Sequence, residues 1–276
     1  MSSLRAALPP GVVARQAEPL SRHTPLRTGG PCAWFLVVHR VDALGGTLDL
    51  LKERGISWNI LGAGTRKVFR DGEAGGAMIR LGTELQRLET DGPAWTVGAG
   101  VPCAALAWAA AEAGRTGLQA LARIPGTLGA ALANDEGDWR AHFAEVAEFR
   151  RGQVSWREQE KSLNSKLILG ARLDLPHEDR DRVVAATADV LRGATALPTW
   201  YERPKRGTAE AELRRVQMAG VRLRGVCIPE AAPEMIVNVG KGPASDLKLL
   251  HSSALKRVKQ LRGVELSSAV TWTGRS

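Results

Sequence analysis

The chain has 276 residues, of which 44% are hydrophobic and 24% are charged, the composition of a soluble globular protein with a sizeable core. Its formal net charge of +9 favours anionic ligands such as nucleotides and phosphates. The N-terminal residues lack a long apolar stretch and are interrupted by Pro9 and Pro10. We therefore expect no signal peptide, no membrane span and a cytoplasmic protein.

The three cysteines are widely separated and odd in number. No pair has the Cys-x-x-Cys spacing of a metal site, so we expect no bound metal. Cys32, Cys103 and Cys227 each sit among apolar neighbours. This setting predicts buried free thiols in a reducing compartment.

The first half of the chain predicts an α/β unit that follows a loosely tied leader at about residues 1–20. Short connections join apolar runs, which predict strands, to segments with helical spacing or many alanines, which predict helices. The expected strands lie at 32–39, 57–64, 77–81 and 95–100, and the expected helices lie at 41–55 and 103–114.

The second half begins with a loop rich in proline, glycine and alanine at 123–139. Alternating hydrophobicity, an amphipathic period and turn residues predict the elements that follow. These are a hairpin at 144–160 with its turn at Arg151–Gly152, a strand at 166–175, a helix at 177–194, a basic connector at 197–215, two short strands within 221–242, a helix at 244–263 and a strand-like end at 264–272.

The segment ILGAGTRKVFRDGE, at residues 60–73, has the pattern of a phosphate-holding loop. Gly62 and Gly64 follow an apolar strand, where glycines let backbone N–H groups converge on an anion. The third glycine of a Rossmann fingerprint is absent, so a Rossmann site is not expected. A plain turn is the competing interpretation. A second glycine turn at 98–100 and the IPGTLGA loop at 124–130 favour a shared cradle for a phosphate and a ring.

Four collinear segments carry a resemblance to a known family: RHTPLRTGGPCAWF, ILGAGTRKVFRDGEAGGAMIRL, WTVGAGVPCAALAWAAAEAGRTGLQALARIPGTLGAAL and EMIVNVGKGPASDL. Over about residues 20–270 they resemble the UDP-N-acetylenolpyruvoylglucosamine reductases, the MurB type, in their shorter subtype. The resemblance implies an α+β fold. An FAD-binding type-2 module (PCMH and vanillyl-alcohol-oxidase-like) of two subdomains, at 21–82 and 83–195, would follow the leader at 1–20 and precede a small α/β substrate-type domain at 196–276.

Members of this family reduce the enolpyruvyl ether of a UDP-sugar with NADPH and FAD. The resemblance therefore implies FAD as the cofactor, with NADPH as the reductant only if the chain is active. The family's GxGSN loop, which wraps the FAD pyrophosphate, reads GAGTR here. The residues that the resemblance assigns to FAD are Gly62, Ala63, Gly64, Thr65, Arg66, Asp71, Gly98, Ala99, Gly100, Ile124, Pro125, Gly126, Thr127 and Gly129.

The catalytic groups of the family are not found at their expected positions. The family supplies an arginine, a serine and a glutamate, which stabilise an enolate and protonate it. The arginine position reads Glu160, the serine loop is deleted, and the glutamate position reads Ala269. Glu265 lies four residues earlier, about 13 Å away along a strand. We therefore predict no catalytic residue and a pseudoenzyme with a regulatory or scaffolding role in peptidoglycan-precursor synthesis.

Two alternatives stay open. The first is an active FAD- and NADPH-dependent reductase of UDP-N-acetylenolpyruvoylglucosamine, or of a related nucleotide sugar, which uses other residues. The second is binding of an anion or nucleic acid through the basic C-terminal region, where residues 202–224 contain seven Lys or Arg and three Asp or Glu. The expected partners are a nucleotide sugar or another anionic ligand and proteins of cell-wall synthesis, and nucleic acid is the less favoured partner.

Overall fold

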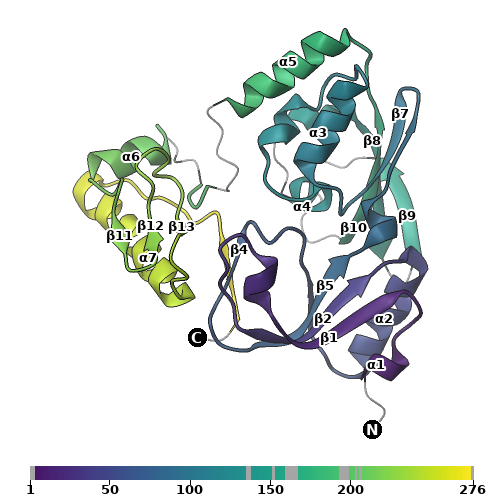
Figure 1. Cartoon of the computed structure of the whole chain (residues 1–276), viewed down its shortest axis with the longest axis horizontal. Helices are drawn as coiled ribbons and strands as arrows, with labels where there is room; N and C mark the ends of the chain where they lie inside the picture. The colour runs from purple at the N-terminus through teal and green to yellow at the C-terminus, as the bar shows by residue number, and fades with distance from the viewer. Residues whose placement is uncertain are drawn as a thin grey trace. The chain divides into compact units, whose positions relative to one another are not determined.

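A computed structural model describes residues 4–134, 138–150, 153–158, 167–192, 199–202, 204 and 207–274 (Figure 1). The chain divides into two compact units that alternate along the sequence. The first unit comprises residues 1–16, 34–63 and 76–196, and the second comprises 17–33, 64–75 and 197–276. The sequence-based domain boundaries at residues 20, 82 and 195 stay predictions.

A four-stranded sheet has the order β1-β2-β5-β3. Strand β3 pairs in parallel with β5, and Trp58 lies opposite Ala77. The helix α2 begins without a side-chain cap from its own N-cap residue, but the Glu84 carboxylate accepts a hydrogen bond from Val41 N at 2.8 Å. The elements are α1 (Leu4–Ala7), β1 (Val12–Pro19), η1 (Leu20–His23), β2 (Pro31–Val38), α2 (Val41–Glu53), β3 (Trp58–Ile60), β5 (Ala74–Leu81) and η2 (Thr83–Gln86).

A five-stranded antiparallel sheet with the order β6-β7-β10-β8-β9 organises the rest of the first unit. Its core contains Trp95, Val97 and Ala171 from the sheet and Leu106 and Ala107 from α3. The elements are β6 (Leu88–Asp91), β7 (Ala94–Gly98), α3 (Cys103–Glu112), η3 (Gln119–Arg123), α4 (Leu128–Ala133), η4 (Asp138–His142), β8 (Phe143–Arg150), β9 (Gln153–Glu158), β10 (Leu167–Asp174) and α5 (Arg180–Leu191).

The second unit has its own apolar core, in which Trp200 is 1% exposed and packs near Trp272. Glu212 of α6 is buried and receives hydrogen bonds from Arg215 and from Arg262 of α7, which ties the two helices together. The elements are β4 (Lys67–Phe69), α6 (Ala209–Arg215), β11 (Arg222–Leu223), β12 (Val226–Cys227), β13 (Val237–Asn238), α7 (Ala244–Arg262) and β14 (Thr271–Thr273).

Five sequence-based predictions need correction. The two short strands expected within 221–242 are three, because β11, β12 and β13 pair in one antiparallel sheet. Residues 12–19 of the expected leader form strand β1 in a sheet. The small-residue run in the expected loop at 123–139 forms helix α4, because leucine and alanine have high helix propensity. The basic connector contains α6, which Thr208 caps by accepting a hydrogen bond from Ala211 N. The last strand covers Thr271–Thr273 rather than the whole of 264–272.

The α+β fold class is confirmed, as is the hairpin formed by β8 and β9, whose turn at Arg151–Gly152 lies outside the described residues. Cys32, Cys103 and Cys227 are buried free thiols, as predicted. Burial raises the pKa of Cys32 to about 11 and that of Cys103 to about 12, so neither provides a thiolate at neutral pH. Across the described residues, no helix is long and apolar enough to cross a membrane.

Candidate cofactor site

Two of the glycine segments predicted from the sequence pack against each other in the first unit. The backbones of residues 98–103 and 126–129 are joined by three hydrogen bonds: Cys103 N to Gly126 O at 3.0 Å, Leu128 N to Val101 O at 2.8 Å, and Gly129 N to Ala99 O at 2.8 Å. A Cβ at position 129 would lie 2.8 Å from the Ala99 Cβ, so only glycine permits this approach. The two segments therefore form one tightly joined backbone surface.

The first glycine segment reaches the same surface. A Cβ added to Gly62 would lie 2.7 Å from Thr127 Oγ1, so the residue at position 62 lies directly against the third segment. Leu61 N donates to Ile79 O at 2.8 Å, which fixes the segment to strand β5. We call Gly62 together with residues 98–103 and 126–129 the glycine cradle.

Part of the glycine cradle is accessible to solvent. Ala63 is exposed, and Gly62, Gly126 and Thr127 are half-buried. Gly126 has a φ of +136°, a conformation that favours glycine and turns the IPGT segment into the cradle. Small residues with accessible backbone groups are what a dinucleotide pyrophosphate and a flat ring require, so the residues present fit FAD.

The rest of the glycine loop belongs to the second unit. Gly64 has a φ of +68°, and a Cβ there would lie 2.8 Å from the backbone oxygen of His23. After Thr65 and Arg66 the chain enters β4, which pairs in parallel with the C-terminal strand β14. Thr271 N donates to Arg66 O at 2.9 Å. Strand β14 therefore lies beside the loop that the family resemblance assigned to the FAD pyrophosphate.

Asp71, which the sequence assigned to FAD, binds the N-terminus of helix α7. Its Oδ1 accepts a hydrogen bond from Ala244 N at 2.8 Å, and its Oδ2 accepts one from Ser245 N at 3.3 Å. These are unsatisfied N–H groups of the first turn, where a carboxylate is also favoured by the helix dipole. The structure thus gives Asp71 a capping function that the sequence did not suggest.

Substituting Asp71 with alanine is expected to lower the free energy of unfolding by about 1 kcal/mol, because α7 loses its cap. The measurement is urea denaturation, with Glu73→Ala as the control because Glu73 is an exposed carboxylate two residues away. Equal stability losses in the two variants would contradict the capping function.

Lys67 is a residue of this loop that the sequence-based assignment left out. It is half-buried, although a lysine is usually exposed, and burial lowers its pKa. The sequence did contain an indication of this unusual lysine, since a cationic residue stands between a glycine loop and the apolar pair Val68 and Phe69. It could not be interpreted before the pairing of β4 with β14 was known.

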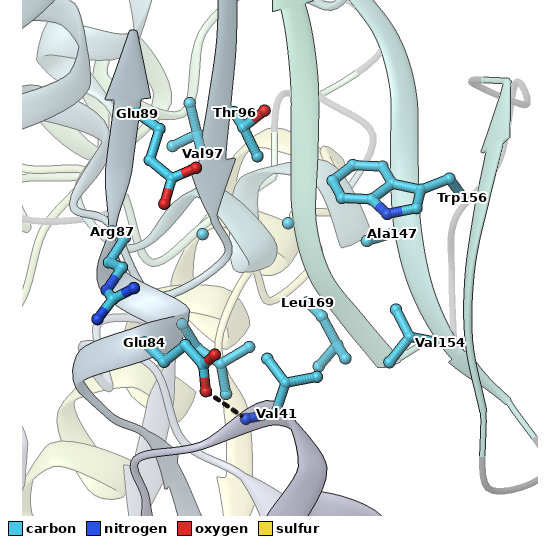
Figure 2. A pocket seen from close by; sticks show the side chains of 13 residues that line it. Val41, Glu84, Arg87, Glu89, Thr96, Val97, Ala147, Val154, Trp156 and Leu169 are labelled. Carbon is cyan, nitrogen blue, oxygen red and sulfur yellow. Dashed lines mark hydrogen bonds between the residues drawn. The ribbon is translucent and has the colours of Figure 1, made fainter.

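A separate cavity of about 270 Å³ lies on the five-stranded sheet, and it contains Gly98 but no other residue predicted to bind FAD. Figure 2 shows Glu84 and Glu89 on one side of this cavity and Val154 and Trp156 on the other. The Arg172 guanidinium lies 4.1 Å from the centre of the Trp156 ring. The cavity is therefore distinct from the surface formed by Gly62 and Thr127.

Comparisons with known proteins agree with this geometry. An FAD binding domain family matches residues 33–149, a range that contains every residue predicted to bind FAD. The UDP-N-acetylenolpyruvoylglucosamine reductase of Pelobacter propionicus is 30% identical over 279 residues, which cover 93% of this chain and 94% of the relative. The chain belongs to the UDP-N-acetylenolpyruvoylglucosamine reductase family.

Other relatives show the same whole-length similarity. The UDP-N-acetylenolpyruvoylglucosamine reductase of Bacillus velezensis is 26% identical over 94% of this chain and 93% of the relative. The crystal structure of the UDP-N-acetylenolpyruvylglucosamine reductase (MurB) from Thermus caldophilus superposes with a TM-score of 0.79 at 22% identity, over 95% of this chain and 99% of that chain. The predicted family, its FAD-binding type-2 fold and its FAD cofactor are confirmed, whereas the contacts of individual residues with FAD stay predictions.

The structure describes one of the positions at which the family's catalytic groups were expected. Ala269 is half-buried just before β14, and its N–H donates to Trp200 O at 3.0 Å. Glu160 lies outside the described residues. Glu265 is not a replacement, because it is exposed and forms an ion pair with Lys259 at 3.0 Å. A methyl group therefore stands where the family is expected to carry a carboxylate.

Proposed function

We propose that this chain is an FAD- and NADPH-dependent reductase that acts on UDP-N-acetylenolpyruvoylglucosamine. The observation that carries the proposal is the similarity to reductases of this name along almost the whole of both chains, including the C-terminal part that supplies β14. A protein that had kept only a cofactor-binding module would not need this part. The pseudoenzyme interpretation becomes the second candidate.

The glycine cradle has the properties that the cofactor requires. Gly62, the turn at 98–100 and the IPGT segment would contact FAD through their backbones, and Thr65 keeps a hydroxyl group next to the loop. Arg66 adds a positive charge, which favours the anionic pyrophosphate. When bound and reduced by NADPH, FAD supplies the hydride for the enolpyruvyl double bond. The chain's own residues must exclude water, orient the substrate and deliver a proton.

The experiment uses the full chain, reconstituted with FAD if needed. We expect flavin absorbance in the purified protein, loss of that absorbance after anaerobic addition of NADPH, and its return when UDP-N-acetylenolpyruvoylglucosamine is added. UDP-N-acetylglucosamine is the control, because it lacks the enolpyruvyl ether and should not restore the absorbance. Mass spectrometry should find a product two mass units heavier than the substrate, since one hydride and one proton are added.

A second candidate is a family member that holds FAD but does not reduce the enolpyruvyl ether. The methyl group of Ala269 favours it, because the expected carboxylate is absent. In this case NADPH would still bleach the flavin, but the nucleotide sugar would not restore the absorbance. A protein that cannot bind FAD at all would contradict both candidates.

A further inference from the structure

The separate cavity of about 270 Å³ lies on the face of the five-stranded sheet that points away from the apolar core. Val97 and Ala171 lie opposite each other in β7 and β10, and both are fully buried in the core of the first unit. Because side chains alternate along a strand, the next pair in register, Gly98 and Gly170, belongs to the other face. All residues that line the cavity belong to the first unit, so its shape does not depend on the second unit.

The floor of the cavity consists of small residues that are neighbours across the strands. Gly170 of β10 lies between Gly98 of β7 and Ala147 of β8 in the register. Ala147 in turn lies opposite Trp156 of β9. Neighbouring strands are about 4.8 Å apart, so these three small residues leave about 10 Å of the sheet surface without long side chains. Trp156 ends this stretch and forms one wall of the cavity (Figure 2).

The wall on the β9 side is apolar and held in position. The Arg172 guanidinium lies 4.1 Å from the centre of the Trp156 ring, and it donates a hydrogen bond to Glu145 Oε2 at 2.6 Å. Val154 precedes Trp156 by two residues, lines the same cavity and is 41% exposed. An indole that is already ordered loses little conformational freedom when a ligand packs against it. Trp156 and Val154 therefore present a preformed apolar surface.

The opposite wall is polar and carries charges of both signs. Figure 2 shows Glu84, Arg87 and Glu89 on this side, facing Trp156 across the cavity. Glu84 Oε2 accepts a hydrogen bond from Val41 N at 2.8 Å, which orients its carboxylate. The wall thus offers carboxylate acceptors and guanidinium donors, and Thr96 adds a hydroxyl group that can do both. Such a mixture favours a ligand with hydrogen-bond donors and acceptors but without net charge.

We propose that this cavity is a binding site for an uncharged sugar ring. The C–H groups on one face of such a ring form an apolar surface that packs on Trp156 and Val154. Its hydroxyl groups donate to Glu89 and accept from Arg87, because each hydroxyl is both a donor and an acceptor. One ligand therefore matches both walls, whereas a phosphate would face Glu84 and Glu89 and an ammonium group would face Arg87.

The size of the cavity agrees with a single ring. Its volume of about 270 Å³ equals that of about nine water molecules, which suits one sugar ring with its hydroxyl groups and not a dinucleotide. Gly98 is its only lining residue among those predicted to bind FAD. The site is therefore separate from the cofactor surface, and the inference does not depend on the proposed reductase function.

The test uses the full chain in the presence of excess FAD and three probes that share one ring. Methyl β-glucoside is uncharged, glucosamine carries an ammonium group, and glucuronate carries a carboxylate. Saturation-transfer NMR on the probes measures their binding and yields dissociation constants by titration. We expect the glucoside to bind about tenfold more tightly than either charged probe, because each charge would meet a like charge on the polar wall.

Substitutions place the bound probe in the cavity. Trp156→Ala should weaken glucoside binding about tenfold, because the ring loses its apolar platform. Trp58→Ala is the matched control, since Trp58 is an exposed tryptophan on β3 that does not line the cavity. Ala147→Leu should abolish binding by filling the floor, and Thr96→Val, which removes only a hydroxyl, should weaken it about threefold. An unchanged Tm shows that each variant is folded.

A substitution of Glu89 distinguishes recognition of hydroxyl groups from recognition of charge. Glu89→Gln keeps an acceptor oxygen without the negative charge, so glucoside binding should stay within about threefold of the wild type. Tightest binding of glucosamine, together with its loss in Glu89→Gln, would instead identify a cation site and contradict the proposal. Absence of saturation transfer to the glucoside, or equal binding by Trp156→Ala and Trp58→Ala, would also contradict it.

Discussion

Replacing Gly98 with alanine is expected to destabilise the protein by about 3 kcal/mol and to remove FAD binding. A Cβ at this position would lie 2.2 Å from the carbonyl oxygen of Leu85 and 2.4 Å from its carbonyl carbon. That carbonyl also accepts a hydrogen bond from Gly100 N at 2.8 Å, so it cannot move aside without breaking the turn. Urea denaturation and flavin absorbance of the variant measure the two effects.

The matched control is Gly75→Ala. Gly75 lies in strand β5, has nothing within 4 Å of an added Cβ and is not among the glycines with a positive φ. We expect its free energy of unfolding to change by no more than about 0.5 kcal/mol. Equal losses in the free energy of unfolding for Gly98→Ala and Gly75→Ala would show that the close approach of Leu85 is not the reason for glycine at position 98.

The stability of the second unit is expected to fall by about 3 kcal/mol as the pH decreases from 7 to 4, because of His251. This histidine is 4% exposed and stacks on Tyr201 with ring centres 5.2 Å apart. Burial lowers its pKa to about 4 and outweighs a hydrogen bond to the backbone of Trp200, which acts in the opposite direction. The folded protein therefore keeps a neutral imidazole where the unfolded chain, with an ordinary pKa near 6.5, binds a proton.

The sign of the effect follows from proton binding. Above pH 6.5 both states hold a neutral His251, so the full stability is present. Between pH 6.5 and about 4 the unfolded state binds more protons, and stability decreases by up to about 1.4 kcal/mol per pH unit. Chemical denaturation of wild type and His251→Phe over this range is the measurement. Equal pH slopes in the two proteins would show that His251 does not cause the loss.

Local sequence patterns predicted much of the secondary structure. The amphipathic spacing in α5 and the hairpin pattern of β8 and β9 depend on residues close in the chain, so they could be interpreted without tertiary information. Strand β1 could not, because it is stabilised by pairing within a sheet rather than by its own pattern. The cap of α7 was equally hidden, since Asp71 lies far from Ala244 in the sequence.

The candidate site shows the same division between local and long-range information. The glycines of the cradle can be recognised in the sequence, because few other residues fit such turns. That Gly62 lies against Thr127 is a tertiary contact and could not be predicted from the pattern. The absence of a glutamate at Ala269 was visible in the sequence, but the pairing of Lys67 with Thr271 was not, because it joins segments that lie far apart in the chain.

The most direct test of the reductase function is the anaerobic reoxidation of the NADPH-reduced protein. UDP-N-acetylenolpyruvoylglucosamine is predicted to restore the flavin absorbance in proportion to the amount added, with formation of the reduced sugar nucleotide. A protein that is bleached by NADPH and stays bleached in the presence of this substrate would contradict the account.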